Sequence, residues 1–137
     1  MITESHIITH LLQYPAITDW IGGRIYPYGL LPQSTDGQVS AQLPAVTVAL
    51  IRGEGHYTTS AVKPYEVART QIDVWGATGA TVSQIYNAID AILDGYRGGI
   101  STSEAGGVFR NTAPPLAYDS DIRLYRAILD YSIHLVC

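Results

Sequence analysis

The feature that most constrains this chain is the segment 68–75 together with the pattern that follows it. Small or apolar side chains alternate there with polar or aromatic ones, which is the period-two signature of a half-buried strand. The two sets are Ala68, Thr70, Ile72 and Val74 on one face, and Arg69, Gln71, Asp73 and Trp75 on the other. After a short Gly/Thr connection, apolar residues recur at helical spacing from Val82 to Tyr96. The pattern therefore predicts a strand, then an amphipathic helix that folds back onto the sheet.

This helix has recognisable ends. Thr81 and Gln84 have the capping-box spacing, which predicts that the helix begins at Thr81. Gly95 marks its expected end, and the pair Gly98-Gly99 forbids its continuation.

The remaining elements follow from the same periodicities. We expect a first helix over residues 3–14, interrupted by Pro15 and followed by one further short turn over 16–21. Proline confines a short strand at 24–28 to an edge or an end of the sheet. Further strands are predicted at 44–51, 108–112 and 122–136, and loops at 29–43, 52–64 and 98–107.

This order of elements predicts the fold class. Helices at two points and hairpin-linked strands elsewhere indicate an α+β fold, and 137 residues fit one domain spanning 1–137. We expect a mostly antiparallel sheet of about four to five strands, with two helices packed on one face. The segments 29–43 and 52–64 are expected to form long loop and hairpin arms.

Composition limits the classes of function. Only 15% of the residues are charged, against roughly 25% in an average soluble domain, and this favours an oligomer or an assembly component. The net charge of −4 and the absence of a basic patch argue against a phosphate-holding nucleic-acid binder. Cys137 is the only cysteine, so no internal disulfide is possible. No apolar run approaches the ~20 residues of a membrane span, and no leader opens the chain.

No catalytic or metal site is predicted. The chain has no Gly-x-Ser-x-Gly motif, and Cys137 is terminal. Asp119 and Asp121 lie in a turn sequence, which favours turn formation over paired-carboxylate chemistry. His6 and His10 are four residues apart but lack a third ligand, so we expect them to face solvent. His56 and His134 have no visible partners. Accordingly, neither enzymatic activity nor a cofactor is expected.

Several short sequence motifs, or phrases, occur along the chain in an order typical of one protein family. They are Arg24-Ile-Tyr-Pro27, Leu43-Pro-Ala-Val46, Arg69-Thr-Gln-Ile-Asp-Val-Trp75 and Tyr118-Asp-Ser-Asp121 with Tyr125-Arg126, with the amphipathic helix between the third and fourth. In these phrases the chain resembles the tail-completion (tail-terminator, head–tail joining) proteins of long-tailed bacteriophages and prophages. The resemblance extends from about Ile7 to Ile133.

This resemblance implies a structural virion protein without enzyme activity. Such proteins form a ring, typically hexameric, that caps the head-proximal end of the tail tube, stops tube polymerisation and docks the head connector. The implied partners are further copies of the chain, the tube protein and the head-connector or head-closure protein. DNA passes through the ring without sequence-specific binding, and the ring is assembled in the host cytoplasm. Two alternatives stay open: another connector component, such as a head-closure or neck protein, and a small-ligand or enzyme domain with a pocket between helix and sheet.

The expected contact residues lie mainly on the two arms. We expect Arg52, Glu54, His56 and Tyr57 on one arm, and Gln33 and Asp36 on the other, to contact neighbouring subunits or the tube. Arg126 and Asp130 lie on the polar face of the last strand, which is either solvated or in contact with a neighbouring subunit.

Overall fold

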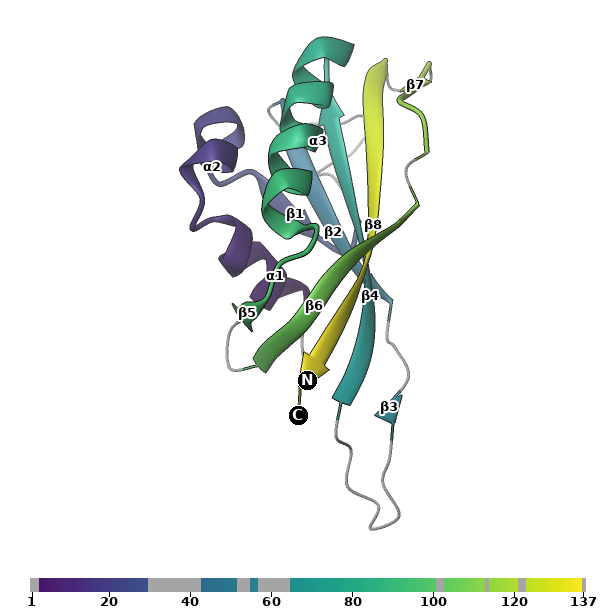
Figure 1. Ribbon diagram of the computed structural model, residues 1–137. Coiled ribbons are helices and arrows are strands. Elements are labelled where there is room, and N and C mark those ends of the chain that lie inside the picture. The colour runs from purple at the N-terminus through teal and green to yellow at the C-terminus, as the bar shows by residue number, and fades with distance from the viewer. Residues whose placement is uncertain are drawn as a thin grey trace.

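One strongly twisted sheet with helices on one face makes up the protein, as the computed structural model shows (Figure 1). The structure describes residues 3–29, 43–51, 55–56, 65–100, 103–112, 114–120 and 123–136. Within these residues the helices are α1 (Glu4–Leu11), α2 (Pro15–Ile21) and α3 (Gly79–Leu93). The strands are β1 (Ile25–Pro27), β2 (Ala45–Ile51), β3 (Gly55–His56), β4 (Tyr65–Gly76), β5 (Gly98–Ile100), β6 (Ser103–Thr112), β7 (Ala117–Asp119) and β8 (Leu124–Val136).

The sheet is built around the β4–β8 pair. Its strand order is β1-β2-β4-β8-β6-β5, with β3 paired to β4 and β7 paired to β8. All twelve residues of β4 pair with β8, from Tyr65 opposite Val136 to Gly76 opposite Tyr125. Only β1 and β2 run parallel among the described pairs, and a parallel pair needs a long connection such as the one between Pro27 and Ala45. The predicted α+β class with a mostly antiparallel sheet is confirmed.

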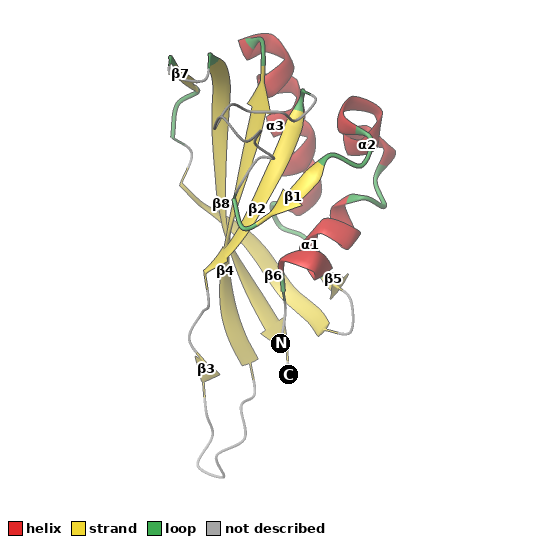
Figure 2. Ribbon diagram, turned by 180° about the vertical axis from the view of Figure 1, so that it is seen from behind, coloured by secondary structure: helices red, strands yellow, loops and turns green. Residues whose placement is uncertain are grey.

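The core lies between the helices and one face of this sheet. Figure 2 shows the other face, over which no helix of the described chain lies. The predicted core face of β4 is confirmed, because Ala68, Thr70, Ile72 and Val74 are all buried. On the opposite face Asp73 and Trp75 are buried as well, so the strand is not half-buried along its whole length. The buried stripe of α3 consists of Val82, Ile85, Ile89 and Leu93. Full burial of one such side chain contributes roughly 1.5–3 kcal/mol, so this stripe is the main attachment of α3 to the sheet.

The start of α3 differs from the sequence prediction. The helix begins at Gly79 with Thr78 as its N-cap, and the Thr78 hydroxyl accepts a hydrogen bond from the Thr81 backbone N–H at 3.4 Å. Thr81 is therefore in the first turn rather than at the cap. The predicted end near Gly95 is confirmed, since the last helical residue is Leu93, Asp94 is the C-cap and Gly95 follows with a φ of +80°. Position 76, just before the cap, requires glycine, because a Cβ there would come within 2.7 Å of the Val82 side chain.

Several other predictions are wrong in detail. The described chain has eight strands rather than four or five, and a third helix, α2, replaces the short turn expected over 16–21. The loop predicted over 98–107 contains β5 and the first part of β6. Glycine and serine give this stretch little strand propensity, but the pairing of β5 with β6 and of β6 with β8 holds it in the sheet. The predicted strand at 122–136 begins at Leu124.

His10 is also placed differently from the prediction, because only 5% of its surface is exposed. Its ring makes edge contacts with the rings of Tyr14, at 5.3 Å, and Tyr96, at 4.7 Å. The Tyr96 hydroxyl in turn donates to the Gly99 carbonyl at 3.0 Å. This cluster joins the end of α1 to the segment between α3 and β5.

The other end of α1 is attached to the edge of the sheet. Glu4 accepts a hydrogen bond from the Leu50 backbone N–H at 3.3 Å. The register of β1 reaches only Val48 of β2, so Leu50 lies beyond the paired part of that edge. A carboxylate in the first helical turn thus satisfies a strand donor that β1 leaves free.

Replacing Thr78 by alanine tests the observed cap. We expect Thr78→Ala to lower the free energy of unfolding by about 1 kcal/mol, since it removes the side-chain acceptor at the helix start. Thr81→Ala is the matched control, and its loss should be clearly smaller because alanine favours the helix interior. Urea unfolding followed by circular dichroism measures both. An equal or larger loss for Thr81→Ala would contradict the observed helix start.

Burial of His10 predicts a pH dependence of stability. Desolvation lowers the pKa of His10 below its ordinary value of 6.5, so the unfolded chain binds this proton more readily than the native chain. Stability attributable to His10 is therefore present above about pH 6.5 and is lost as the pH falls below it. His10→Phe keeps a ring between Tyr14 and Tyr96 but cannot be protonated.

Thermal unfolding at about pH 7.5 and about pH 5 compares the two proteins. We expect the melting temperature of the wild type to fall more on acidification than that of His10→Phe. The same fall in both proteins would show that His10 does not carry the effect.

Candidate functional site

The sheet face opposite the helices carries a connected set of polar side chains. We call it the open sheet face, and its described members from β4 and β8 are Val67, Arg69, Gln71, Asp73, Trp75, Arg126, Ile128, Asp130, Ser132 and His134. Phe109 and Asn111 of β6 extend it beside β8, and Thr47 of β2 extends it beside β4. The strand period of two places all of these side chains on one side.

Two ion pairs cross between β4 and β8 on this face. Arg69 makes a bidentate contact with Asp130, with Nε at 3.1 Å from both carboxylate oxygens. Arg126 lies 2.6 Å from Asp73, at the other end of the face. The side chain of Asp73 is 4% exposed and that of Asp130 is 12% exposed, whereas Arg69 is 53% exposed. The carboxylates are thus covered and Arg69 extends toward solvent, whereas the Arg126 side chain is 35% exposed and its Nε is buried.

Neighbouring side chains also donate to the two carboxylates, whereas the buried Nε of Arg126 has no hydrogen-bond partner among the described residues. Asp73 also accepts from the Gln71 amide at 3.1 Å, and Asp130 accepts from the Asn111 amide at 3.4 Å. The side-chain amide oxygen of Asn111 accepts a hydrogen bond from the Ser132 hydroxyl at 2.9 Å. The hydrogen bond and charge attraction of Asp130 raise the pKa of Arg69 further, so this pair stays ionised.

At one end of the open sheet face the polar set gives way to aromatic packing. Trp75 donates from its indole N–H to the Thr47 hydroxyl at 3.1 Å, and the Arg126 guanidinium lies 4.9 Å from the Trp75 ring. A small second apolar cluster surrounds this tryptophan. Its buried members are Ala45, Trp75 and Leu124, with Tyr26 and Leu43 packed against them.

The predicted contact residues fall into two groups. Arg126 and Asp130 lie together on the open sheet face, but each is paired within the chain to a residue of β4. Gln33, Asp36, Arg52, Glu54 and Tyr57 lie outside the described residues, as does Cys137. His56 is in β3, paired with Tyr65, and its side chain is not described. Contacts through the two arms therefore stay a prediction.

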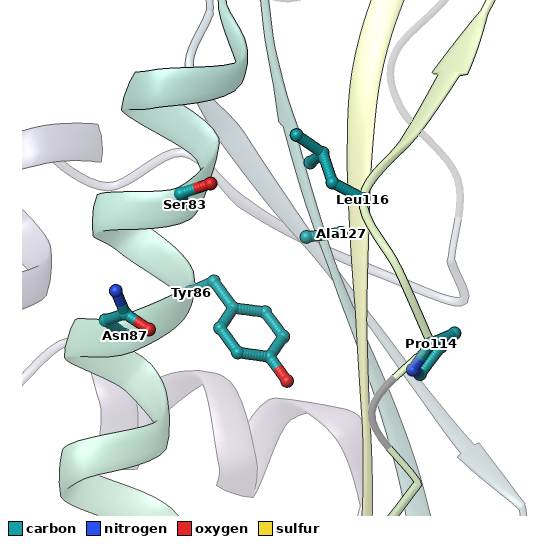
Figure 3. Close-up of a pocket in the computed structure, with 6 residues that line it drawn as sticks. All are labelled: Ser83, Tyr86, Asn87, Pro114, Leu116 and Ala127. Atoms are coloured by element: carbon teal, nitrogen blue, oxygen red, sulfur yellow. The ribbon is translucent and has the colours of Figure 1, made fainter.

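A groove of about 320 Å³ lies on the helix side of the sheet, between α3 and β8 (Figure 3). Its lining comprises Ser83, Tyr86, Asn87, Pro114, Leu116 and Ala127. The figure shows the α3 residues on one side and the proline and leucine of the β6–β7 connection on the other. Tyr86 is the only titratable side chain in this lining, so the groove offers a binding surface rather than an acid–base pair.

The acidic residues nearest this region have structural partners. Asp90 of α3 accepts a hydrogen bond from the Tyr131 hydroxyl at 2.8 Å and forms a 2.8 Å ion pair with Arg110. Burial and the adjacent Asp90 carboxylate raise the pKa of Tyr131 far above its usual range. Asp94 accepts from the Arg110 backbone N–H at 3.1 Å. These contacts attach α3 to β6 and β8.

Other candidate groups from the sequence do not converge. Asp119 is exposed in β7, and Asp121 lies outside the described residues. Within the described ranges, no three His, Cys, Asp or Glu side chains are placed to hold a metal ion. None of the helices in the described part of the chain is long and apolar enough to span a membrane.

Sequence reasoning missed the exposed apolar residues near the groove and at the sheet edge. Leu116 and Tyr118 are 42% and 52% exposed, and Tyr28 is 71% exposed. Their only signal in the sequence is a large apolar residue inside a turn-rich stretch, which occurs often on protein surfaces. Their significance depends on the groove, which forms only when the chain folds.

Comparison with known proteins identifies the class. The family model described as "Tail completion protein gp17" matches residues 5–135. The chain therefore belongs to this family of tail completion proteins, which confirms the resemblance found in the sequence. This membership makes it a structural protein of the virion tail, and it indicates a structural rather than a catalytic role.

A solved structure shares the fold. It is titled "Virion of native gene transfer agent (GTA) particle", and one of its chains aligns with a TM-score of 0.66 at 16% sequence identity. The alignment covers 95% of this chain and 92% of that chain. No curated protein matches the sequence.

The two ion pairs of the open sheet face should differ in their contribution to stability. Arg126→Ala leaves the buried Asp73 carboxylate with only Gln71, and we expect a loss of about 2 kcal/mol in the free energy of unfolding. Arg69→Ala is the matched control with a clearly smaller loss, because Arg69 is mostly exposed and Asp130 keeps Asn111. Urea unfolding measures both variants. Equal losses would contradict this assignment of the buried pair.

Proposed function

We propose that the protein assembles into a ring on the head-proximal end of the phage tail tube. There the ring ends tube polymerisation and offers the docking surface for the head connector. The observation that carries this proposal is the match of the tail completion family over residues 5–135. The shared fold with a chain of a gene transfer agent virion is consistent with it.

The surface chemistry of the described residues supports a role in protein contacts. The four charged side chains of the open sheet face, Arg69, Asp73, Arg126 and Asp130, form two ion pairs and leave no net charge. A face of this kind does not hold phosphate groups as a cluster of arginines would. DNA that passes such a ring would therefore meet no electrostatic trap on this face.

Ring formation needs a contact between two different surfaces of each subunit. A head-to-tail contact of this kind closes into a ring when its rotation divides a full turn, and otherwise gives a filament. We propose a hexamer, with Arg126 and Asp130 and the two arms among its contact residues. The ring would be completed in the host cytoplasm and carried into the virion.

Electron microscopy of the purified protein mixed with tail tubes tests this function. We expect a ring-shaped density at one tube end and an arrest of further growth when tube protein is added. The same protein should then allow heads to join capped tubes. Binding to isolated head connectors but not to tubes would favour a head-closure or neck role instead. A protein that binds neither would contradict both assignments.

A further inference from the structure

Tyr28 is an exposed aromatic residue with an unusual backbone. Its φ is +62°, a conformation that side chains other than glycine, asparagine and aspartate rarely adopt. The conformation is fixed on its C-terminal side, where the Gly29 N–H donates to the Val48 carbonyl at 3.1 Å. The side chain is 71% exposed, the most exposed of the large apolar residues described. A bulky residue kept in a strained, solvent-exposed position points to a contact outside the subunit.

The groove beside α3 exists because the outer edge of β8 is interrupted. β6 pairs with β8 as far as Asp130, and β7 resumes the pairing at Arg126. Between these points the chain passes through Pro114 and Pro115, which have no N–H to donate to a ladder. The connection leaves the sheet there, and the buried Ala127 forms part of one wall of the groove.

The chemistry of the groove suits a tyrosine ring. Leu116, Pro114 and Ala127 offer apolar surface, and Tyr86 offers an aromatic ring against which a second ring can pack. Ser83 and Asn87 supply polar groups within the same lining, and these can hydrogen-bond a phenolic hydroxyl. No charged side chain belongs to this lining, so filling the groove does not desolvate an ion.

Tyr28 and the groove lie toward opposite edges of the sheet. Tyr28 directly follows β1, the first strand of the order, whereas β7 and the connection before it lie across β8 from β2 and β4 (Figures 1 and 2). A protruding tyrosine at one edge and a groove toward the other can link identical copies head to tail. Each added copy then presents one unoccupied Tyr28 and one unoccupied groove, as the closure of an oligomeric ring requires.

We propose that Tyr28 of one subunit inserts into the groove formed by Tyr86, Pro114, Leu116 and Ala127 of the next copy of the same chain. This inference rests on the proposed ring and names the contact that closes it. Tyr28 is the anchor of the contact, and Leu116 is the residue of the groove rim that covers it.

Two single variants that each destroy one half of the contact provide the main test. Tyr28→Asn removes the aromatic side chain and keeps a residue that tolerates a positive φ. Leu116→Glu places a charge in the groove. We expect each variant alone to lose ring formation on tail tubes, with subunit affinity at least about tenfold weaker, as for a hot-spot residue. Mixed in solution, the two variants should form a heterodimer and nothing larger. Only one contact is available between them, in which Tyr28 of the Leu116→Glu variant enters the groove of the Tyr28→Asn variant.

Leu12→Ser is the matched control, since Leu12 is the C-cap residue of α1, is 39% exposed and belongs to neither half of the contact. It should form rings like the wild type. Circular dichroism and thermal unfolding establish that all three variants are folded. Rings formed by both Tyr28→Asn and Leu116→Glu would overturn the proposal.

Cross-linking distinguishes failure of this contact from failure of the ring function. In a Cys137→Ser background, Tyr28→Cys and Leu116→Cys are combined, the protein is assembled on tail tubes, and a short bismaleimide is added. We expect a ladder of linked subunits that the single-cysteine variants do not give. Rings without a ladder would overturn the contact and leave the proposed function standing, whereas no rings from the wild type would overturn both.

Discussion

The structure depends on the uninterrupted pairing of β4 with β8. These are the longest strands of the described chain, and their side chains supply both the helix-covered core and the polar open sheet face. Ile72 and Leu129 face each other beneath the helices, while Arg69 and Asp130 are ion-paired on the opposite side. A slip of one residue in this register would move the apolar set to the open face and the charges into the core. The register is therefore specified on both faces at once.

The helices make the remaining attachments to this pair. α3 contributes its apolar stripe and, at its C-terminal part, the Asp90 carboxylate that bonds both Tyr131 and Arg110. The buried His10 cluster joins α1 to the chain that leaves α3. Attachment at two levels, apolar along the helix and polar near its end, fixes the distance between α3 and β8. That distance determines the width of the groove lined by Tyr86 and Ala127.

Strongly periodic segments were predictable from the sequence, and segments held by their neighbours were not. β4, β8 and α3 each carry a complete apolar stripe, so their type and the buried faces follow from residue spacing alone. β5 and the start of β6 contain Gly98, Gly99 and Gly107, and they form strands because β5 pairs with β6 and β6 pairs with β8. Arg126 and Asp130 were recognised as members of one face, but their partners Asp73 and Arg69 follow only from the strand register. The groove involves residues from three segments that lie between Ser83 and Ala127, and no local pattern encodes it.

The hydrogen bond between Glu4 and the Leu50 N–H bears on how the edge of β2 is protected against other chains. An exposed strand edge with free N–H groups invites another chain to add a strand, and strand addition is hard to reverse. Here a helix carboxylate occupies that donor within the subunit. Another chain can therefore add a strand through this donor only after it displaces the Glu4 carboxylate.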